Sequence, residues 1–210
     1  MTRARWADRL ERVLQAGVVR VGTTIDTPVF SMQKVSGDLH GFDMDVLATL
    51  ESALGVRVEY VKMSFGTMIP DLLADKFDVA MSGMGRTPER ARVATFSKPY
   101  MRYGKLLMIR AADSDRFRSL TDLDNAGIKI GYNHGGLNDH FAKTRFTRAT
   151  PVGYPSNQLA TVDLLAAKID AQVQDSTSAI YLSRTNPQLA AMDPKNVFNP
   201  VYVAMLLHRE

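Results

Sequence analysis

Residues 79 to 100 contain the side chains and turns best suited to binding a small anion. The stretch opens as an apolar run typical of a buried strand end, and Gly83 and Gly85 then keep its backbone free of bulk. Thr87 has the hydroxyl of a helix N-cap, a proline follows it, and Arg90 falls in the first turn of the expected helix. Free amides at a helix start and a guanidinium together bind carboxylates, so the stretch predicts a carboxylate-binding turn. The alternative is a strand, a turn and a capped helix with a surface arginine.

A second set of polar residues lies in the later half of the chain. Asn133, Gly135 and Gly136 belong to a glycine-rich turn before a helix predicted from about residue 137 to 146. The open amide end of that helix is suited to a second anionic group. Asp175 ends a predicted strand and precedes another predicted helix, so it is either a ligand contact or an N-cap.

The elements that position the first set alternate between helix and strand. This order predicts a parallel sheet with right-handed crossovers, which binds ligands at the carboxyl ends of its strands. Thr24 opens the loop 24–30 after the first strand, and Phe65 follows the second strand. Phe65 is either an aromatic wall of the site or a core residue under the next helix. Predicted strands cover residues 18–23, 56–62 and 77–81, and predicted helices cover 5–16, 41–53 and 67–76.

The remaining elements form a second lobe, with Gly104 as a plausible hinge position at its start. We expect an α/β protein of two lobes, each a mostly parallel sheet flanked by helices. Lobe 1 covers residues 1–100 with 201–210 returning to it, and lobe 2 covers 101–200. Predicted strands of lobe 2 are 106–109, 128–132 and 169–174, and its predicted helices are 119–123, 137–146, 157–167 and 176–183. A last predicted strand at 201–207 returns to lobe 1.

Composition excludes several classes of function. The chain has 210 residues, 45% of them hydrophobic, with a net charge of +4 and no basic run beside aromatics, so nucleic acid is not an expected partner. It has no cysteine, which excludes disulfides and thiolate metal sites, and its four histidines lack metal-ligand spacing. We therefore expect neither a cofactor nor a metal.

No apolar run approaches the ~18 residues of a membrane span, so membrane insertion is not expected. The start of the chain is charged and lacks the apolar core of a signal peptide. The chain is then either a mature periplasmic form or a cytoplasmic protein.

The stretch from residue 79 to 100 also resembles the signature of family 3 extracellular solute-binding proteins, which bind polar amino acids for bacterial uptake systems. The resemblance implies a type II periplasmic-binding-protein fold, a monomer that closes by hinge motion, and an ABC transporter permease as a partner. It also implies that Arg90 and backbone around Gly83 hold the ligand α-carboxylate, while Phe65 packs on the ligand and Asp175 pairs with its α-ammonium. A hydroxyl residue usually stands where this chain has Gly85. The residues that carry the resemblance are Gly83, Thr87, Glu89, Arg90, Phe96, Ser97, Pro99 and Tyr100.

Several segments resemble the cyclohexadienyl dehydratase branch of that family, whose members convert prephenate or arogenate by loss of water and carbon dioxide. That branch uses a Glu as the general acid, three residues after the second-lobe Asp, where this chain has Ser178. Relatives also continue with a helix after the last strand, whereas this sequence stops at Glu210, so that helix is expected to be missing. The matching segments lie at Thr23, Thr24, Asp26 and Phe30, at 99–105, at 133–138 and at 186–194.

These patterns favour a binding protein for a small carboxylate, with an amino acid as the favoured ligand held in the cleft between the lobes. A dehydratase-type lyase is the alternative, and no residue is assigned a catalytic role. The expected ligand-binding residues are Thr24, Phe65, Gly83, Gly85, Arg90, Asn133, Gly135, Gly136 and Asp175.

Overall fold

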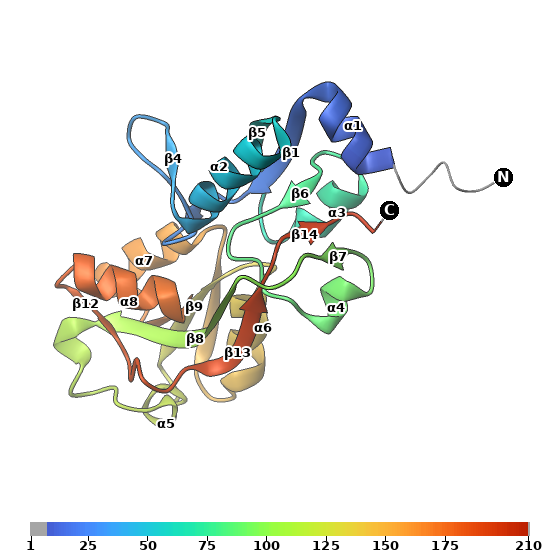
Figure 1. Ribbon diagram of the computed structural model, residues 1–210. Coiled ribbons are helices and arrows are strands. Elements are labelled where there is room, and N and C mark those ends of the chain that lie inside the picture. Colours follow the sequence, from blue (N-terminus) through green and yellow to red (C-terminus); the bar gives the residue numbers. More distant parts are fainter. Residues whose placement is uncertain (1–7, 210) are drawn as a thin grey trace. The chain divides into compact units, whose positions relative to one another are not determined.

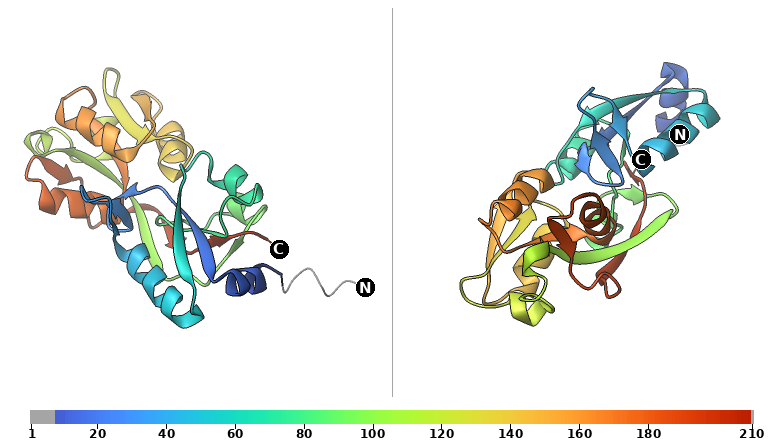
Figure 2. Two further views of the ribbon diagram at one scale, coloured as in Figure 1. Left: turned by 90° about the horizontal axis from the view of Figure 1, so that it is seen from above. Right: turned by 90° about the vertical axis from the view of Figure 1, so that its left-hand side faces the viewer.

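A computed structural model describes residues 8–209 of the chain (Figure 1). The chain forms two compact units: unit 1 extends to Met101 and resumes at Tyr202, and unit 2 comprises Arg102–Val201. The chain therefore passes from one unit to the other twice. Both described ends belong to unit 1 (Figure 2).

Unit 1 is built on a five-stranded mixed sheet in the order β5-β1-β6-β14-β7. The strands β1, β5 and β6 run parallel, whereas β14 is antiparallel to both of its neighbours, β6 and β7. The prediction of a strand at residues 18–23 is confirmed, because apolar residues at alternating positions of β1 are buried. The strands are β1 (Val18–Thr23), β5 (Arg57–Lys62), β6 (Val79–Ala80), β7 (Thr95–Phe96) and β14 (Leu206–Leu207).

The described part of unit 1 contains four helices, and three of them pack on its parallel strands. α1 contacts β1, α2 contacts β5, and α3 contacts β6 (Figure 1). Gly55 adopts the left-handed conformation with φ of 65° and ends α2, a conformation that costs glycine little. Residues 5–7 of the helix predicted over 5–16 lie outside the described residues. The helices are α1 (Asp8–Ala16), α2 (Phe42–Leu54), α3 (Met68–Leu73) and α4 (Pro88–Ala91).

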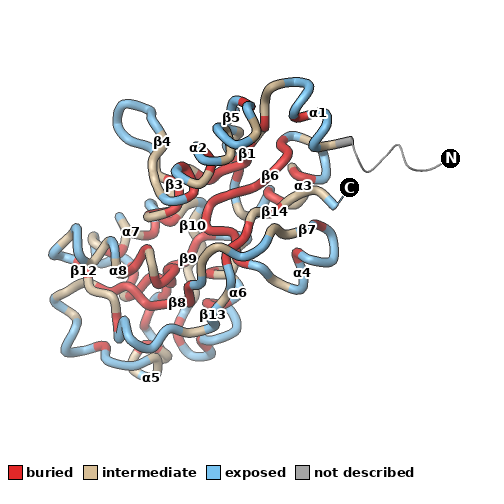
Figure 3. The backbone as a smooth tube through the Cα atoms, viewed as in Figure 1, coloured by how far each residue is buried: buried red, intermediate tan, exposed pale blue. Residues whose placement is uncertain are grey.

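The prediction of a loop at residues 24–30 is partly wrong, because this region contains the first strand of a small three-stranded antiparallel sheet. β2 (Asp26–Thr27), β3 (Ser31–Gln33) and β4 (Leu39–His40) form this sheet. Its connection at residues 34–38 is exposed (Figure 3). These strands are too short to show the two-residue periodicity on which the prediction depended. The helix predicted over 67–76 is also shorter, since Asp75 has a φ of 59° and breaks it.

Unit 2 contains a six-stranded mixed sheet in the order β10-β9-β11-β8-β12, with β13 paired to β8. β10, β9 and β11 are parallel, and β8 and β12 are antiparallel to their neighbours. β10 and β12 were not predicted, and the last strand predicted at 201–207 is two strands, β13 and β14. The strands are β8 (Met101–Arg110), β9 (Lys129–Asn133), β10 (Thr150–Tyr154), β11 (Ala171–Asp175), β12 (Leu189–Ala191) and β13 (Phe198–Val203).

The core of unit 2 lies on both faces of its sheet. Leu107 and Ile109 of β8 pack into a cluster with Phe141 of α6, whereas Met108 packs into another cluster with Leu164 of α7. This alternation is the two-residue period of a strand buried on both sides (Figure 3). Gly104, predicted as a hinge position, lies inside β8. The helices are α5 (Leu120–Leu123), α6 (Leu137–Arg145), α7 (Asn157–Leu165) and α8 (Ser176–Thr185), with a short 3-10 turn at Ala111–Asp113.

Within residues 8–209, no helix has the length and apolar character needed to cross a membrane. In the same range, no three His, Cys, Asp or Glu side chains are grouped so as to hold a metal ion.

Candidate ligand-binding site

A cluster of buried hydroxyl groups lies after the carboxyl ends of β1 and β6 in unit 1. Thr24 Oγ1 lies 2.8 Å from Thr27 Oγ1 and 2.7 Å from Ser82 Oγ, and Ser31 Oγ lies 2.6 Å from Ser82 Oγ. All four side chains are nearly inaccessible to solvent. Hydroxyls both donate and accept, so this cluster satisfies itself while keeping a polar, uncharged wall at the sheet edge.

The turn at Gly83 is held in place by Asp43. The Gly83 N–H donates to Asp43 Oδ2 at 2.8 Å, and the Tyr100 hydroxyl donates to Asp43 Oδ1 at 2.9 Å. Gly83 has a φ of +64°, and a Cβ there would lie 2.7 Å from the ring of Phe30, so only glycine fits without strain. Burial raises the pKa of Asp43 to about 6, although the hydrogen bonds from Gly83 and Tyr100 act in the opposite direction.

Arg90 is fixed at both its backbone and its guanidinium. Thr87 Oγ1 accepts from the Arg90 backbone N–H at 3.2 Å, so the predicted N-cap of α4 is confirmed. Arg90 Nη1 donates to the Gly85 carbonyl at 3.0 Å, and Gly85 is in turn bridged to Val203 near the end of β13. Arg90 is only 9% exposed, which rules out the interpretation as a surface arginine.

Phe65 is half-buried and follows β5. It packs against the cluster that contains Met68 and Leu72 of α3, so the core contact foreseen for this ring is present. Its half-exposed state leaves part of the ring for another contact.

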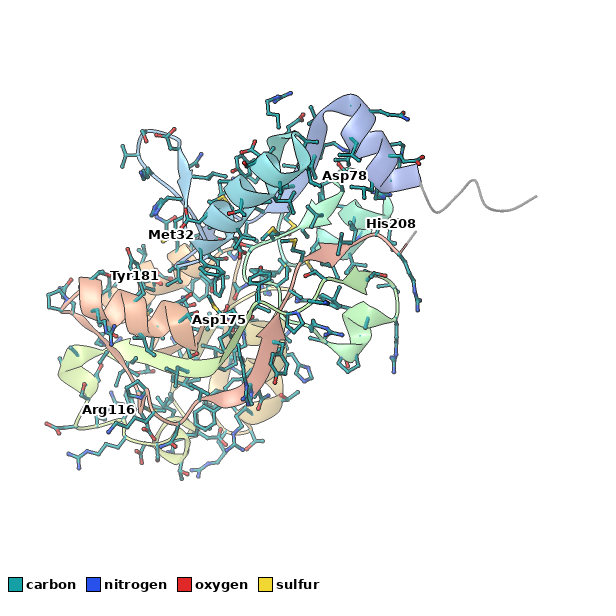
Figure 4. The ribbon with its side chains drawn as sticks, in the orientation of Figure 1. Met32, Asp78, Arg116, Asp175, Tyr181 and His208 are labelled. Carbon is teal, nitrogen blue, oxygen red and sulfur yellow. The ribbon has the colours of Figure 1, made fainter. Side chains whose placement is uncertain are left out.

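Asp175 of unit 2 forms an ion pair with Lys105. The antiparallel pairing of β11 and β8 sets Asp175 opposite Lys105, and Lys105 Nζ donates to Asp175 Oδ1. Figure 4 labels Asp175 at the point where β11 gives way to α8. Its side chain makes no capping hydrogen bond to α8, so the N-cap alternative is wrong in that respect. The structure therefore gives Asp175 a protein cation that the sequence interpretation did not pair with it.

The glycine-rich turn after β9 lies beside this pair in the sheet order, because β9 and β11 are parallel neighbours. Asn138 Nδ2 donates to Asn133 Oδ1 at 2.8 Å, and Gly136 stands at the N-cap of α6. The Gly135 N–H donates to Asp139 Oδ2 at 2.9 Å, so a carboxylate of the chain already occupies part of the helix amide end predicted for an anion.

The structure thus gathers the predicted residues in two sets. Thr24, Gly83, Gly85 and Arg90 gather at the strand ends of unit 1, with Phe65 following β5. Asn133, Gly135, Gly136 and Asp175 follow neighbouring strands of unit 2.

Sequence reasoning missed the parts played by three polar residues. Asp43 was placed only within the helix predicted over residues 41–53, and the sequence showed no sign that it reaches the Gly83 turn, forty positions away. Ser82 was not singled out, although it lies within hydrogen-bond distance of three hydroxyls. Lys105 ends the segment 99–105 that carries a resemblance but was left out of the site; a full length for β8 with the register of β11 would have placed it opposite Asp175.

Comparison with known proteins gives these sites a context. The model of bacterial extracellular solute-binding proteins, family 3, matches residues 19–193. Cyclohexadienyl dehydratase of Pseudomonas aeruginosa is 35% identical over 96% of this chain and 75% of its own length. ABC transporter arginine-binding protein 1 of Escherichia coli is 28% identical over 88% of this chain and 73% of its own length.

Solved structures agree with the sequence matches. An ancestral amino-acid-binding protein, a precursor of cyclohexadienyl dehydratase, superposes with a TM-score of 0.89 at 30% identity, covering 95% of this chain and 86% of that one. The holo arginine-binding protein of T. maritima gives a TM-score of 0.86 at 28% identity, with the same two coverages of 95% and 86%. With its two-unit α/β fold and a family match across most of its length, this chain belongs to family 3 of the bacterial extracellular solute-binding proteins.

Proposed function

We propose that this chain is the solute-binding component of an ABC-type uptake system and that it binds a small carboxylate, with an amino acid as the favoured ligand. The observation that carries the proposal is the buried Arg90, whose guanidinium is oriented by the Gly85 carbonyl. A guanidinium is a planar fork of donors whose geometry matches a carboxylate, and its contact with the Gly85 carbonyl fixes the orientation of that plane. Relatives named for arginine binding support the choice of an amino acid.

Arg90 has the leading part in this proposal because the Gly83 N–H already donates to Asp43. The carboxylate contact predicted for the backbone near Gly83 thus falls mainly to the guanidinium, and the Gly83 turn shapes the wall beside it. Asp175, at the end of β11, is the residue that we propose to pair with the α-ammonium of the ligand. The chain acts as a monomer in the periplasm, with a permease as its partner, and uses no cofactor.

The substitution Arg90→Lys tests the carboxylate assignment. Lysine keeps the charge but loses the bidentate fork, so we expect a loss of at least ~2 kcal/mol in binding free energy, as for a desolvated charge pair. Calorimetric titration of the purified chain with the twenty amino acids measures it. Arg92→Lys on an exposed neighbour is the matched control and should leave affinity unchanged. Equal affinities for Arg90→Lys and the parent chain would refute the assignment.

The substitution Asp175→Asn tests the ammonium contact. It should weaken an amino acid far more than the 2-oxo acid of the same carbon skeleton, because only the amino acid has the cation. Equal weakening of both ligands would make Asp175 an orienting residue and would remove the ammonium contact from the proposal.

A lyase of the dehydratase type is the second candidate, favoured by the 35% identity to cyclohexadienyl dehydratase. Ser178, fully buried in the first turn of α8, stands where that branch has its acid. Since a positioned general acid contributes about 10²–10⁴-fold, we expect no useful turnover of prephenate. An assay of phenylpyruvate formation by the chain and by Ser178→Glu tests this, and robust activity of the unchanged chain would establish the lyase instead.

A further inference from the structure

Asp43 is a fully buried carboxyl that accepts its hydrogen bonds from uncharged donors. Asp43 Oδ2 accepts from the Gly83 N–H at 2.8 Å, and Asp43 Oδ1 accepts from the Tyr100 hydroxyl at 2.9 Å. The side chain is 0% exposed. Neutral donors replace only part of the hydration that a carboxylate loses on burial, so this residue costs folding stability at neutral pH. A residue that lowers stability in this way is typical of a functional site.

The contact with Asp43 fixes a peptide group that its own residue leaves free to turn. Gly83 has a φ of +64°, and glycine adopts positive and negative φ about equally readily, so the peptide before it has little intrinsic preference for one orientation. The hydrogen bond to Asp43 decides which way that N–H points. Asp43 is itself held by its backbone N–H, which donates to the Phe30 carbonyl at 3.1 Å. The turn therefore rests on the start of α2.

The same stretch leads directly to the carbonyl that orients Arg90. The Gly85 carbonyl accepts from Arg90 Nη1 at 3.0 Å. Backbone hydrogen bonds of 2.7 and 2.9 Å join residues 84–86 to residues 202–204, so the stretch is held after the turn. Asp43 holds the turn itself, just before those bonds begin. A displaced turn would therefore shift the carbonyl that sets the plane of the guanidinium.

We propose that Asp43 is a positioning residue for carboxylate recognition, which fixes the Gly83 turn and, through it, the orientation of Arg90. Because its side chain is inaccessible, Asp43 acts through the turn and not by touching the ligand. A carboxylate suits this task, since two donors face it and each of its oxygens accepts one of them. The inference rests on the proposed carboxylate contact of Arg90 and adds a residue that controls it.

A pair of ligands that differ only at the α-carboxylate tests the proposal. Calorimetric titration compares L-arginine with L-argininamide, its α-carboxamide, and the ratio of the two affinities measures carboxylate recognition. If another of the twenty amino acids binds the parent chain more tightly, that amino acid and its α-carboxamide are used instead. Asp43→Leu removes both acceptor oxygens at a similar side-chain size. We expect the ratio to fall at least ~10-fold, as for a weakened hydrogen bond to a charged group.

The control variants separate positioning from a general loss of stability. Asp43→Asn keeps an oxygen for the Gly83 N–H and should keep the parent ratio. Asp78→Asn alters another buried carboxyl of unit 1, which precedes β6 and accepts from Arg20 Nη2 at 2.8 Å. It should also keep the ratio, although it lowers stability. If Asp43→Leu does not fold, as judged by circular dichroism, Asp43→Ala takes its place, and the same fall in the ratio is expected.

The outcomes distinguish this inference from the proposed function. If Arg90→Lys lowers the ratio but the folded Asp43 variant keeps it, the inference is refuted while the carboxylate contact of Arg90 stands. Equal weakening of both ligands by the Asp43 variant, or an equal fall in the ratio for Asp78→Asn, likewise refutes positioning. If Arg90→Lys leaves the ratio unchanged, or none of the twenty amino acids binds, both the proposed function and the inference fail.

Discussion

Asp43 is the buried carboxyl that holds the Gly83 turn, and its burial makes a specific prediction about stability and pH. Its pKa rises from an ordinary 3.8 to about 6 in the folded chain. A shift of about two pKa units corresponds to about 3 kcal/mol of unfolding free energy. Because the folded state holds its proton more tightly than the unfolded state, this group lowers stability as the pH rises from about 4 through 6. The full penalty is present above that range.

The substitution Asp43→Asn removes this titration while keeping an oxygen that accepts from the Gly83 N–H. We therefore expect the parent chain to gain up to ~3 kcal/mol relative to Asp43→Asn when the pH falls from 7 to 4. Taking the difference between the two proteins cancels the titration of the other carboxyl groups, among them Asp75, Asp78 and Asp139, whose pKa values are lowered. Urea unfolding monitored by circular dichroism, at half-unit steps of pH, measures the difference.

Tyr100→Phe provides the matched control for this prediction. Tyr100→Phe removes a hydrogen bond that lowers the pKa of Asp43, so the pKa should rise further. The midpoint of the stability change with pH, measured for Tyr100→Phe against Tyr100→Phe with Asp43→Asn, should therefore move above pH 6. A difference between the parent chain and Asp43→Asn that stays flat, or that grows as pH rises, would refute the argument from burial.

Three further substitutions test the structure elsewhere. Gly83→Ala places a Cβ 2.7 Å from the Phe30 ring at a φ of +64°, so we expect about 1–3 kcal/mol of lost stability by urea unfolding. Burial raises the pKa of Asp78, but its hydrogen bonds with Arg20 outweigh burial and lower the pKa. Asp78→Asn removes the charge from these hydrogen bonds and should cost about 1.5–3 kcal/mol at pH 7, with the cost shrinking below pH 4 as the parent carboxylate is protonated. Phe117→Ala should cost about 3–5 kcal/mol, because its ring is 2% exposed in the core of unit 2.

The longer elements of the fold could be predicted because each satisfies its local rules. The strand at residues 18–23 alternates half-buried and buried positions over residues 18–21 and is buried to its end, and the helix from residue 42 ends at a glycine in the left-handed conformation. The hairpin sheet of β2, β3 and β4 escaped prediction for the opposite reason. Its strands have two or three residues each. Ile25 and Val29 adopt positive φ angles, which β-branched residues rarely do, so the sequence gives no indication of these turns.

In the candidate site, too, contacts between residues close in sequence could be predicted, and contacts between distant residues could not. The cap from Thr87 to the backbone of Arg90 spans three residues, and sequence spacing alone predicts it. The bond from Gly83 to Asp43 and the pair of Lys105 with Asp175 join residues forty and seventy positions apart. Such contacts depend on strand register and on which helix returns to which turn, and neither is written in local periodicity. The hydrogen-bond and ion-pair partners of Asp43 and Asp175 could therefore be identified only from the structure.

Proton supply is what separates a binding protein from a lyase on this scaffold. Loss of a hydroxyl group from a ligand requires a group that holds a proton near neutral pH and can give it up, which is the work of a carboxyl with a raised pKa. Ser178 is buried in the first turn of α8, but a serine hydroxyl is a very weak acid. Asp139 is no substitute: burial raises its pKa, but hydrogen bonds from Lys143 and Gly135 outweigh burial and keep the pKa below its ordinary value. Asp43 has a raised pKa, yet it is fully buried, and its two oxygens accept hydrogen bonds from the Gly83 N–H and the Tyr100 hydroxyl. None of these three residues therefore combines a raised pKa with a carboxyl oxygen left to give a proton to a ligand, which is the physical basis for expecting no useful turnover of prephenate.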